Sequence, residues 1–269
     1  MKRTKDVPRG RLFRISAVLF LSFFVTCPAP AEPPSACRGK KYDAYIHIDY
    51  VIDGDTVVTT QGKHVRLIGI DTPEIGHGGS VSEPGAGAAR NYLLRLVRHT
   101  DAAYPVVYDR EKLDRHGRTL AHLFLPDGGN IQALILAGGY ATPLTIPPNL
   151  LYHDCYQASA AQAYQRQTGL WSLAQYQPVD VGSLSGDERG YHLVRGFVTR
   201  IGESRLSVWI NLGPDFAARI GRKDLVYFPE LNLAALTGKQ ILVRGKIYRR
   251  NRQLRIYLHH ISDIRILSD

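Results

Sequence analysis

The stretch YIHIDYVIDGDTVVTTQGKHVRLIGIDTPE, residues 45–74, decides the fold. Three short runs rich in β-branched and aromatic residues occupy 45–51, 56–58 and 65–70, and the turns at 53–55 and 61–63 each contain a glycine. Short runs of this composition separated by Gly turns are typical of hairpin-connected strands. The stretch therefore predicts a three-stranded meander at the start of a β-rich α+β fold.

Helical patterns follow the meander. Pro84 stands where a helix can begin, and apolar residues then recur at helical spacing as far as Val97. Further helices are expected at 131–136 and 150–167, and strands at 105–108 and 120–125. A loop containing three prolines is expected at 141–149. We therefore expect one domain over residues 43–177.

The remainder of the chain predicts a second, smaller barrel. Residues 178–189 are expected to be a linker, because Gly, Ser and mixed charges replace the apolar runs. Beyond it, strands are expected at 193–198, 206–212, 240–247 and 254–258, with a short helical stretch at 231–236. Extra strands could occupy 225–228 and 264–267. Short strands around one helix favour an OB-like β-barrel over residues 190–269.

Residues 1–31 resemble a secretory signal peptide. A basic start is followed by the apolar run 15–25, and Ala29-Pro30-Ala31 provides a small-x-small cleavage site. A membrane anchor is the first alternative, although eleven helical residues span roughly 16 Å and a bilayer core is ~30 Å thick. A lipoprotein acylated at Cys27 is a third reading. The expected location is therefore secreted or periplasmic, without a stable membrane span.

Cleavage after Ala31 leaves two cysteines, Cys37 and Cys155. An exported protein meets oxidising conditions, so one disulfide is plausible, but the sequence does not show that the two residues approach each other. Neither cysteine belongs to a Cys-x-x-Cys or Cys/His cluster, which argues against zinc and redox chemistry.

The positive charge belongs to the second half of the chain. The full sequence carries a formal charge of +10. Without residues 1–31 it has 28 basic and 23 acidic residues, or +5. Residues 43–177 carry −3, whereas residues 190–269 carry +8. A basic surface of this kind favours a polyanionic partner.

Four short motifs together suggest phosphodiester chemistry. They are Asp53-Gly54-Asp55-Thr56, Arg66 within an apolar run, Asp71-Thr72-Pro73-Glu74, and Asp114-Arg115-His116-Gly117-Arg118. Each alone is more simply read as a turn or a solvated charge. Together, two carboxylates for one cation, two arginines and a further acid match the needs of an attack on phosphate, where negative charge grows on the equatorial oxygens.

This set resembles the thermonuclease family, typified by staphylococcal nuclease. The resemblance is carried by 52–56, 65–67, 71–74 and 114–121, closes with Gly169-Leu170-Trp171, and covers roughly 43–171. It implies a five-stranded OB-type barrel with helices. It also implies a calcium-dependent endonuclease that hydrolyses DNA and RNA and leaves 3′-phosphate ends.

The resemblance also implies individual roles. Asp55, Asp71 and the backbone carbonyl of Thr72 would be calcium ligands, and hard oxygen ligands suit that ion. Glu74 would hold or deprotonate the attacking water, and Arg66 and Arg118 would neutralise the phosphate. The loop after the second helix lacks the tyrosines that stack on a nucleotide in the family type. Here only Tyr140 and Tyr152 flank that loop.

The remaining predicted contacts concern nucleic acid. Arg115, and Arg249, Arg250 and Arg252 at a turn of the second domain, are expected to contact it. Phe197, Trp209, Tyr248 and Tyr257 could offer stacking faces, although most aromatic residues of a small barrel are core. No protein partner is inferred, and a monomer is expected. The alternatives are a catalytically silent nucleic-acid-binding protein on the same fold and, further away, an exported adhesin or inhibitor-like module.

Overall fold

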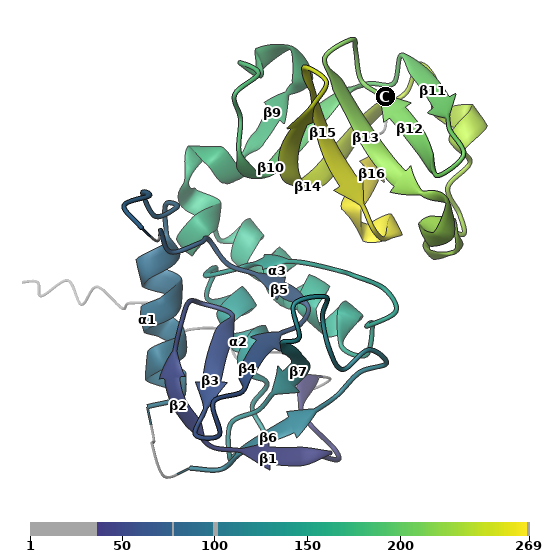
Figure 1. The fold of residues 1–269 in the computed structure, drawn as a ribbon. Helices are drawn as coiled ribbons and strands as arrows, with labels where there is room; N and C mark the ends of the chain where they lie inside the picture. Colours follow the sequence, from purple (N-terminus) through teal and green to yellow (C-terminus); the bar gives the residue numbers. More distant parts are fainter. Residues whose placement is uncertain (1–36, 77, 99–101, 268–269) are drawn as a thin grey trace, which may run out of the picture.

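The protein was examined as a computed structural model, which describes residues 37–76, 78–98 and 102–267. The expected signal peptide and the alternative acylation site at Cys27 lie outside these residues. Within them, no helix has the length and apolar character needed to cross a bilayer. The chain forms two β domains, one above the other in Figure 1, joined through the segment that follows helix α3.

The first domain is built on a six-stranded sheet in the order β1-β6-β7-β4-β3-β2. The strands are β1 (Ala44–Ile46), β2 (Ile48–Val51), β3 (Thr56–Thr59), β4 (His64–Leu67), β6 (Tyr104–Val107) and β7 (Thr119–Leu123). The end strands β1 and β2 are separated in sequence by His47 alone, so one bent segment closes the sheet. Counting that segment once gives the five-stranded OB-type barrel that the family resemblance implies.

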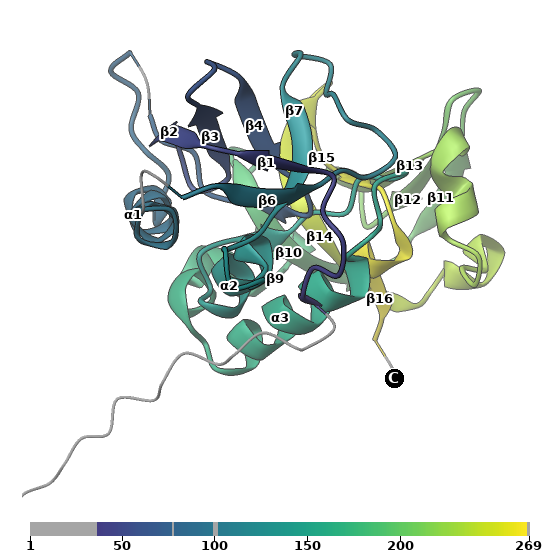
Figure 2. The same cartoon turned by 90° about the horizontal axis from the view of Figure 1, so that it is seen from below.

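Three helices cover this barrel. They are α1 (Ala86–Leu96), α2 (Ile131–Ala137) and α3 (His153–Gln165), and α2 and α3 lie together beside β6 (Figure 2). Asn130 caps α2, because its side chain accepts a hydrogen bond from Ala133 N. Two short strands, β5 (Ile70–Asp71) and β8 (Thr142–Pro143), pair outside the barrel. The expected loop at 141–149 therefore begins with a paired strand.

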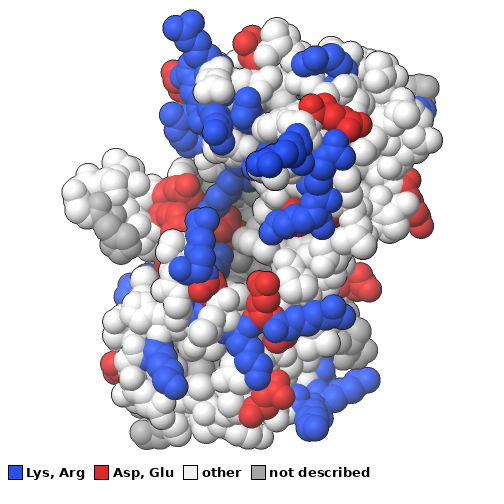
Figure 3. Space-filling view, turned by 45° about the vertical axis from the view of Figure 1, so that its right-hand side comes forward, with Lys and Arg blue, Asp and Glu red and all other residues white. Residues whose placement is uncertain are grey.

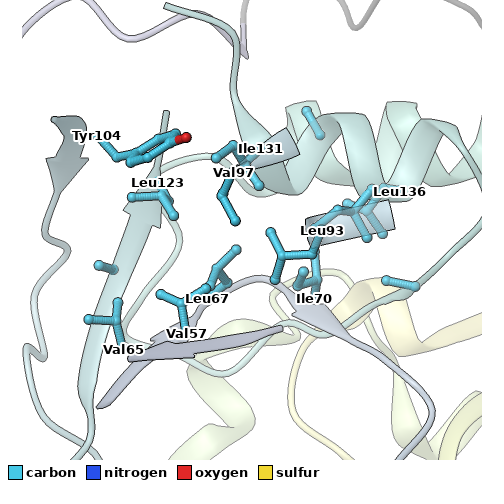
Figure 4. Packing of buried hydrophobic residues seen from close by; sticks show 14 of the residues in the cluster. Val57, Val65, Leu67, Ile70, Leu93, Val97, Tyr104, Leu123, Ile131 and Leu136 are labelled. Carbon is cyan, nitrogen blue, oxygen red and sulfur yellow. The ribbon is translucent and has the colours of Figure 1, made fainter. Parts of the chain in front are cut away.

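The core of the first domain lies between the barrel and the helices. Strand residues Val57, Val65 and Leu67 meet Leu93 of α1 and Ile131 of α2, all of them buried (Figure 4). Burying one such side chain contributes about 1.5–3 kcal/mol. The meander is therefore held against α1 and α2, which fixes the strand ends that carry the polar motifs.

A disulfide joins the start of the first domain to α3. Cys37 and Cys155 are bonded, with Cα atoms 5.5 Å apart and a sequence separation of 118. The pairing that the sequence left open is thus present, and it ties the segment before β1 to the helical side of the barrel.

The second domain repeats the strand order of the first. Its sheet runs β11-β12-β13-β15-β14-β10-β9, and β16 pairs with β14. The strands are β9 (Pro178–Asp180), β10 (Gly190–Phe197), β11 (Arg200–Glu203), β12 (Ser207–Asn211), β13 (Phe216–Gly221), β14 (Gln240–Arg250), β15 (Gln253–Leu258) and β16 (Ile264–Ile266). The nearly continuous β10 and β11 form one long bent segment, and β13 pairs in parallel with β15 as β4 does with β7.

Several elements differ from the sequence expectations. The expected linker at 178–189 begins with β9, which pairs in parallel with β10, so this segment is already part of the second sheet. Residues 222–227 form the 3-10 helix η5 (Arg222–Tyr227), where a strand was considered at 225–228. Strand β13 was not anticipated, because Gly213-Pro214-Asp215 precedes it and two alanines interrupt its apolar pattern.

The two domains are packed together by an aromatic cluster. Trp171 and Tyr176, which follow α3, contact Tyr191 of β10 with ring centroids 6.3 and 5.9 Å away. Leu170 and Leu193 complete the buried set. On the other side of the interface, the ring of His260 lies 4.3 Å from that of His153 of α3. The second domain is therefore docked on the first.

Candidate active site

Arg66 brings the two predicted metal-binding carboxylates together. From β4, its Nη1 is in ionic contact with Asp55 Oδ1, and its Nη2 lies 3.4 Å from Asp71 Oδ1. All three side chains are largely buried, with exposed fractions of 13%, 7% and 10%. Asp55 ends the turn before β3, and Asp71 ends β5, so the strand ends converge as the sequence suggested.

Thr72 fixes the second oxygen of Asp55. Both the backbone N and the Oγ1 of Thr72 donate to Asp55 Oδ2, at 2.9 Å each. The turn can approach this closely because residue 54 is glycine. A Cβ there would lie 2.7 Å from side-chain atoms of Ala89 and Thr72. The Asp-Gly-Asp motif is therefore required by packing against α1 as well as by its turn.

The site concentrates negative charge in a buried place. Burial, together with the charge of Asp55, raises the pKa of Asp53 to about 6. Burial also raises the pKa of Asp71, although Lys246 and Arg66 oppose the shift. Burial acts against the charge of Arg66, but the neighbouring aspartates outweigh it and raise its pKa. An acidic, partly desolvated pocket of this kind attracts a cation.

The second domain contributes a lysine to the same place. Lys246 of β14 lies with Nζ 3.0 Å from Asp71 Oδ2 and 3.4 Å from Glu74 Oε1. Burial acts to lower the pKa of Lys246, but Asp71 and Glu74 outweigh it and raise the pKa. Lys246 was not predicted as a site residue, because only the docking of the two domains brings position 246 to position 71.

Glu74 is the most accessible of the predicted site residues. Its side chain is 62% exposed, and its backbone N donates to Glu83 Oε2 at 3.0 Å. Glu83 was not anticipated as part of the site. It holds the loop after β5, and the carboxylate of Glu74, which contacts Lys246, stays exposed to solvent at the edge of the carboxylate pair.

The second arginine lies in the same cleft as the first. Arg66, Arg115 and Arg118 line a cleft of about 620 Å³, which Lys223 and His259 of the second domain also line. Arg118 is held by Asp114, whose Oδ2 is 2.7 Å from its Nε. Arg115 is exposed and donates to His116. The two predicted phosphate-binding arginines therefore line the same cleft, although Arg118 forms its ion pair with Asp114 and not with Asp55 or Asp71.

The tyrosines that flank the 141–149 loop are used in packing. Tyr140 stacks on Tyr92 of α1 with ring centroids 4.3 Å apart, and Tyr152 packs edge-on against His122 and Phe124. Neither offers a free ring to a base. The loop itself contains no aromatic residue, so the first domain lacks a stacking surface at this edge of the site.

The donor chemistry at the site fits a hard cation. Asp55, Asp71 and the carbonyl of Thr72 supply oxygen only, which is what Ca²⁺ prefers. Within 37–76, 78–98 and 102–267, no group of three or more His, Cys, Asp or Glu side chains is arranged to hold a metal ion. A site with two carboxylates leaves coordination positions to water and to a substrate phosphate.

Known proteins resemble the part of the chain that carries this site. Residues 64–173 match the family described as staphylococcal nuclease homologue. Over 172 residues the chain is 31% identical to a thermonuclease of Staphylococcus intermedius, which covers 62% of this chain and 98% of that protein. The chain belongs to the thermonuclease family. A thermonuclease of Staphylococcus hyicus is 28% identical over 172 residues, covering 62% and 99%.

A larger bacterial protein shares the same family region. Endonuclease YhcR of Bacillus subtilis is 28% identical over 155 residues, which is 52% of this chain and 12% of that protein. The names of these relatives support a nuclease of the thermonuclease family. The matched family region ends at residue 173, so the second β domain lies outside it.

Proposed function

We propose that this protein is an exported, calcium-dependent endonuclease that hydrolyses DNA and RNA and leaves 3′-phosphate ends. The observation that carries the proposal is the convergence of Asp55 and Asp71 on Arg66, which itself lines one cleft with Arg118. Members of the family at 28–31% identity support the nuclease part of this proposal.

Asp55, Asp71 and the carbonyl of Thr72 would hold the calcium ion. When bound, that ion supplies positive charge to the scissile phosphate and to the attacking water. A cage with only two carboxylates should bind it at roughly 10⁻⁴–10⁻³ M, which is the range of extracellular sites.

The side chains of the cleft would then divide the remaining work. Glu74, exposed at the edge of the pair, would orient the attacking water and accept its proton. Arg66 and Arg118 would donate to the phosphate oxygens as negative charge grows on them, which their planar donor groups suit. Arg115 lies further along the cleft and would contact a neighbouring phosphate.

Export would follow from the signal-peptide pattern of residues 1–31. The bond between Cys37 and Cys155 is what an oxidising compartment allows. Calcium is abundant outside cells and scarce in cytosol, so a weak calcium site would also keep the activity outside.

A plasmid digestion tests the proposal. Purified protein should convert supercoiled plasmid to linear and small fragments in millimolar calcium, and excess EGTA should stop the conversion. RNA should be cut under the same conditions, and the new ends should require phosphatase before they accept a 3′ extension. Binding of the plasmid without cleavage would support the catalytically silent alternative instead.

A substitution at the carboxylate pair tests the metal assignment. Asp71→Asn should raise the calcium concentration needed for half-maximal cleavage by about tenfold or more, because it removes one negative ligand. The matched control is Asp49→Asn, at an exposed residue of β2, which makes the same chemical change away from the site. Equal calcium curves for the two variants would contradict the assignment.

A further inference from the structure

The outer surface of the second domain carries alternating basic and aromatic side chains beside the candidate active site. We call this surface the basic–aromatic face. It consists of Lys246, Tyr248, Arg255, Tyr257, Arg219 and Trp209. Lys246 is exposed, and the other five are partly exposed.

Strand pairing makes these residues one continuous face. On β14, Lys246 and Tyr248 are two positions apart and point to the same side, whereas Ile247 between them is core. Tyr248 stands opposite Arg255, Tyr257 opposite Arg219, and Arg219 opposite Trp209. The face therefore crosses four neighbouring strands in the order β14, β15, β13 and β12.

Contacts between the side chains hold the face in order. The guanidinium of Arg219 lies 4.7 Å from the ring centre of Tyr257, and that of Arg255 lies 4.5 Å from the ring centre of Trp209. Tyr257 donates to Asp224, and Arg219 donates to Ser207. The donors and ring planes are thus positioned before any ligand binds, which lowers the ordering cost of binding.

The face begins at the carboxylate pair itself. Lys246 contacts Asp71 and Glu74, and Tyr248 and Tyr257 line one cavity of about 290 Å³ together with Asp71, Thr142 and Leu144. The 142–148 loop offers no aromatic ring of its own. Figure 3 shows Lys and Arg gathered on the upper half of the molecule around the hollow between the halves, with acidic residues within the hollow.

We propose that the basic–aromatic face is a track for single-stranded nucleic acid, which enters the candidate active site past Lys246. The inference rests on the proposed nuclease function and deepens it by naming the preferred substrate form. Phosphates would meet Lys246, Arg255 and Arg219. Bases would stack on Tyr248 and on the guanidinium planes that lie over Tyr257 and Trp209. The three steps from β14 to β12 span roughly 14 Å at the spacing of neighbouring strands.

A single strand is favoured over a duplex by the docking of the domains. Lys246 joins the second domain to the first at the carboxylates, and Arg244 donates to Gln157 nearby. We therefore expect a duplex, which is wider than a single strand, to be hindered at Asp71 by the second domain and to bind less tightly. Its bases would also be stacked on one another and not available to the tyrosines.

Binding measurements in EGTA separate this inference from catalysis. A fluorescein-labelled oligothymidylate should bind the intact protein more tightly than the same length of duplex, as followed by fluorescence anisotropy. Arg219→Gln/Arg255→Gln should weaken the single-strand complex at least tenfold. The slope of log affinity against log salt should fall by about 1.4, because each lost phosphate contact accounts for about 0.7.

Matched variants serve as controls. Arg195→Gln/Arg222→Gln removes the same charge from the second domain, at two exposed residues that pair with Asp180 and Glu203. Its affinity and salt slope should stay at wild-type values. Tyr248→Leu should weaken binding by about 5- to 100-fold, the effect of losing one stacked base. Phe197→Leu, at an exposed residue of β10, should leave binding unchanged.

The outcomes distinguish the two proposals. If the variants of the basic–aromatic face lose binding while the wild type shows no calcium-dependent cleavage, the track is supported and the proposed nuclease function is overturned. Calcium-dependent cleavage with wild-type affinity in both the arginine pair and Tyr248→Leu would overturn the track alone. Equal affinity for single strand and duplex would also overturn it. If the Arg219→Gln/Arg255→Gln variant does not fold, the binding of Tyr248→Leu distinguishes the same outcomes.

Discussion

Arg118→Ala should lower the rate of calcium-dependent DNA cleavage by about 10²–10³-fold or more. Its guanidinium lies in the cleft with Arg66, and removing one positioned donor to a developing negative charge has costs of this order. The loss should fall on kcat, because the charge that Arg118 would neutralise develops only during the attack. The measurement is steady-state cleavage of a labelled oligonucleotide at saturating calcium.

The control for this variant is Arg98→Ala. Arg98 is exposed after the end of α1 and does not line the cleft with Arg66 and Arg118. It should keep the wild-type kcat and the wild-type melting temperature. A fully active Arg118→Ala protein would remove Arg118 from the proposed mechanism.

Removing the disulfide should cost about 4 kcal/mol of unfolding free energy. The bond between Cys37 and Cys155 closes a loop with a sequence separation of 118 residues, and the loss of so large a constraint on the unfolded chain accounts for the size of the effect. The double variant Cys37→Ser/Cys155→Ser should therefore melt roughly 8–16 °C below the wild type. Thermal unfolding followed by circular dichroism measures the difference.

The wild-type protein in excess reductant provides the matched state for this prediction. It should unfold at the temperature of the double variant, because both lack the same constraint. If either the double variant or the reduced wild type melted within about 2 °C of the oxidised protein, the predicted contribution of the disulfide to stability would be contradicted.

The first barrel could be predicted because its signals are local. The Gly turns between residues 53 and 63 and the apolar runs beside them determine β2, β3 and β4 without reference to the rest of the chain. A guanidinium in the run Val65-Arg66-Leu67 must be either solvated or paired, and the structure pairs it with Asp55 and Asp71.

The contribution of the second domain could not be predicted in the same way. Lys246 and Asp71 are far apart in sequence, and no local pattern specifies how two barrels dock. The alternation of Tyr248, Arg255 and Tyr257 becomes a surface only through the register of β14 with β15. Strand β9 was missed for a related reason, since its three residues are strand only by virtue of pairing with β10.

The aromatic cluster at the interface links the solubility of the first domain to the second domain, which covers it. Trp171 and Tyr176 are covered by Tyr191 and Leu193, so a chain that stopped before Gly190 would turn two large rings toward water. Exposed patches of that kind promote self-association. We therefore expect a fragment that ends at Tyr176 to self-associate. The solubility of the first domain would then depend on the presence of the second domain.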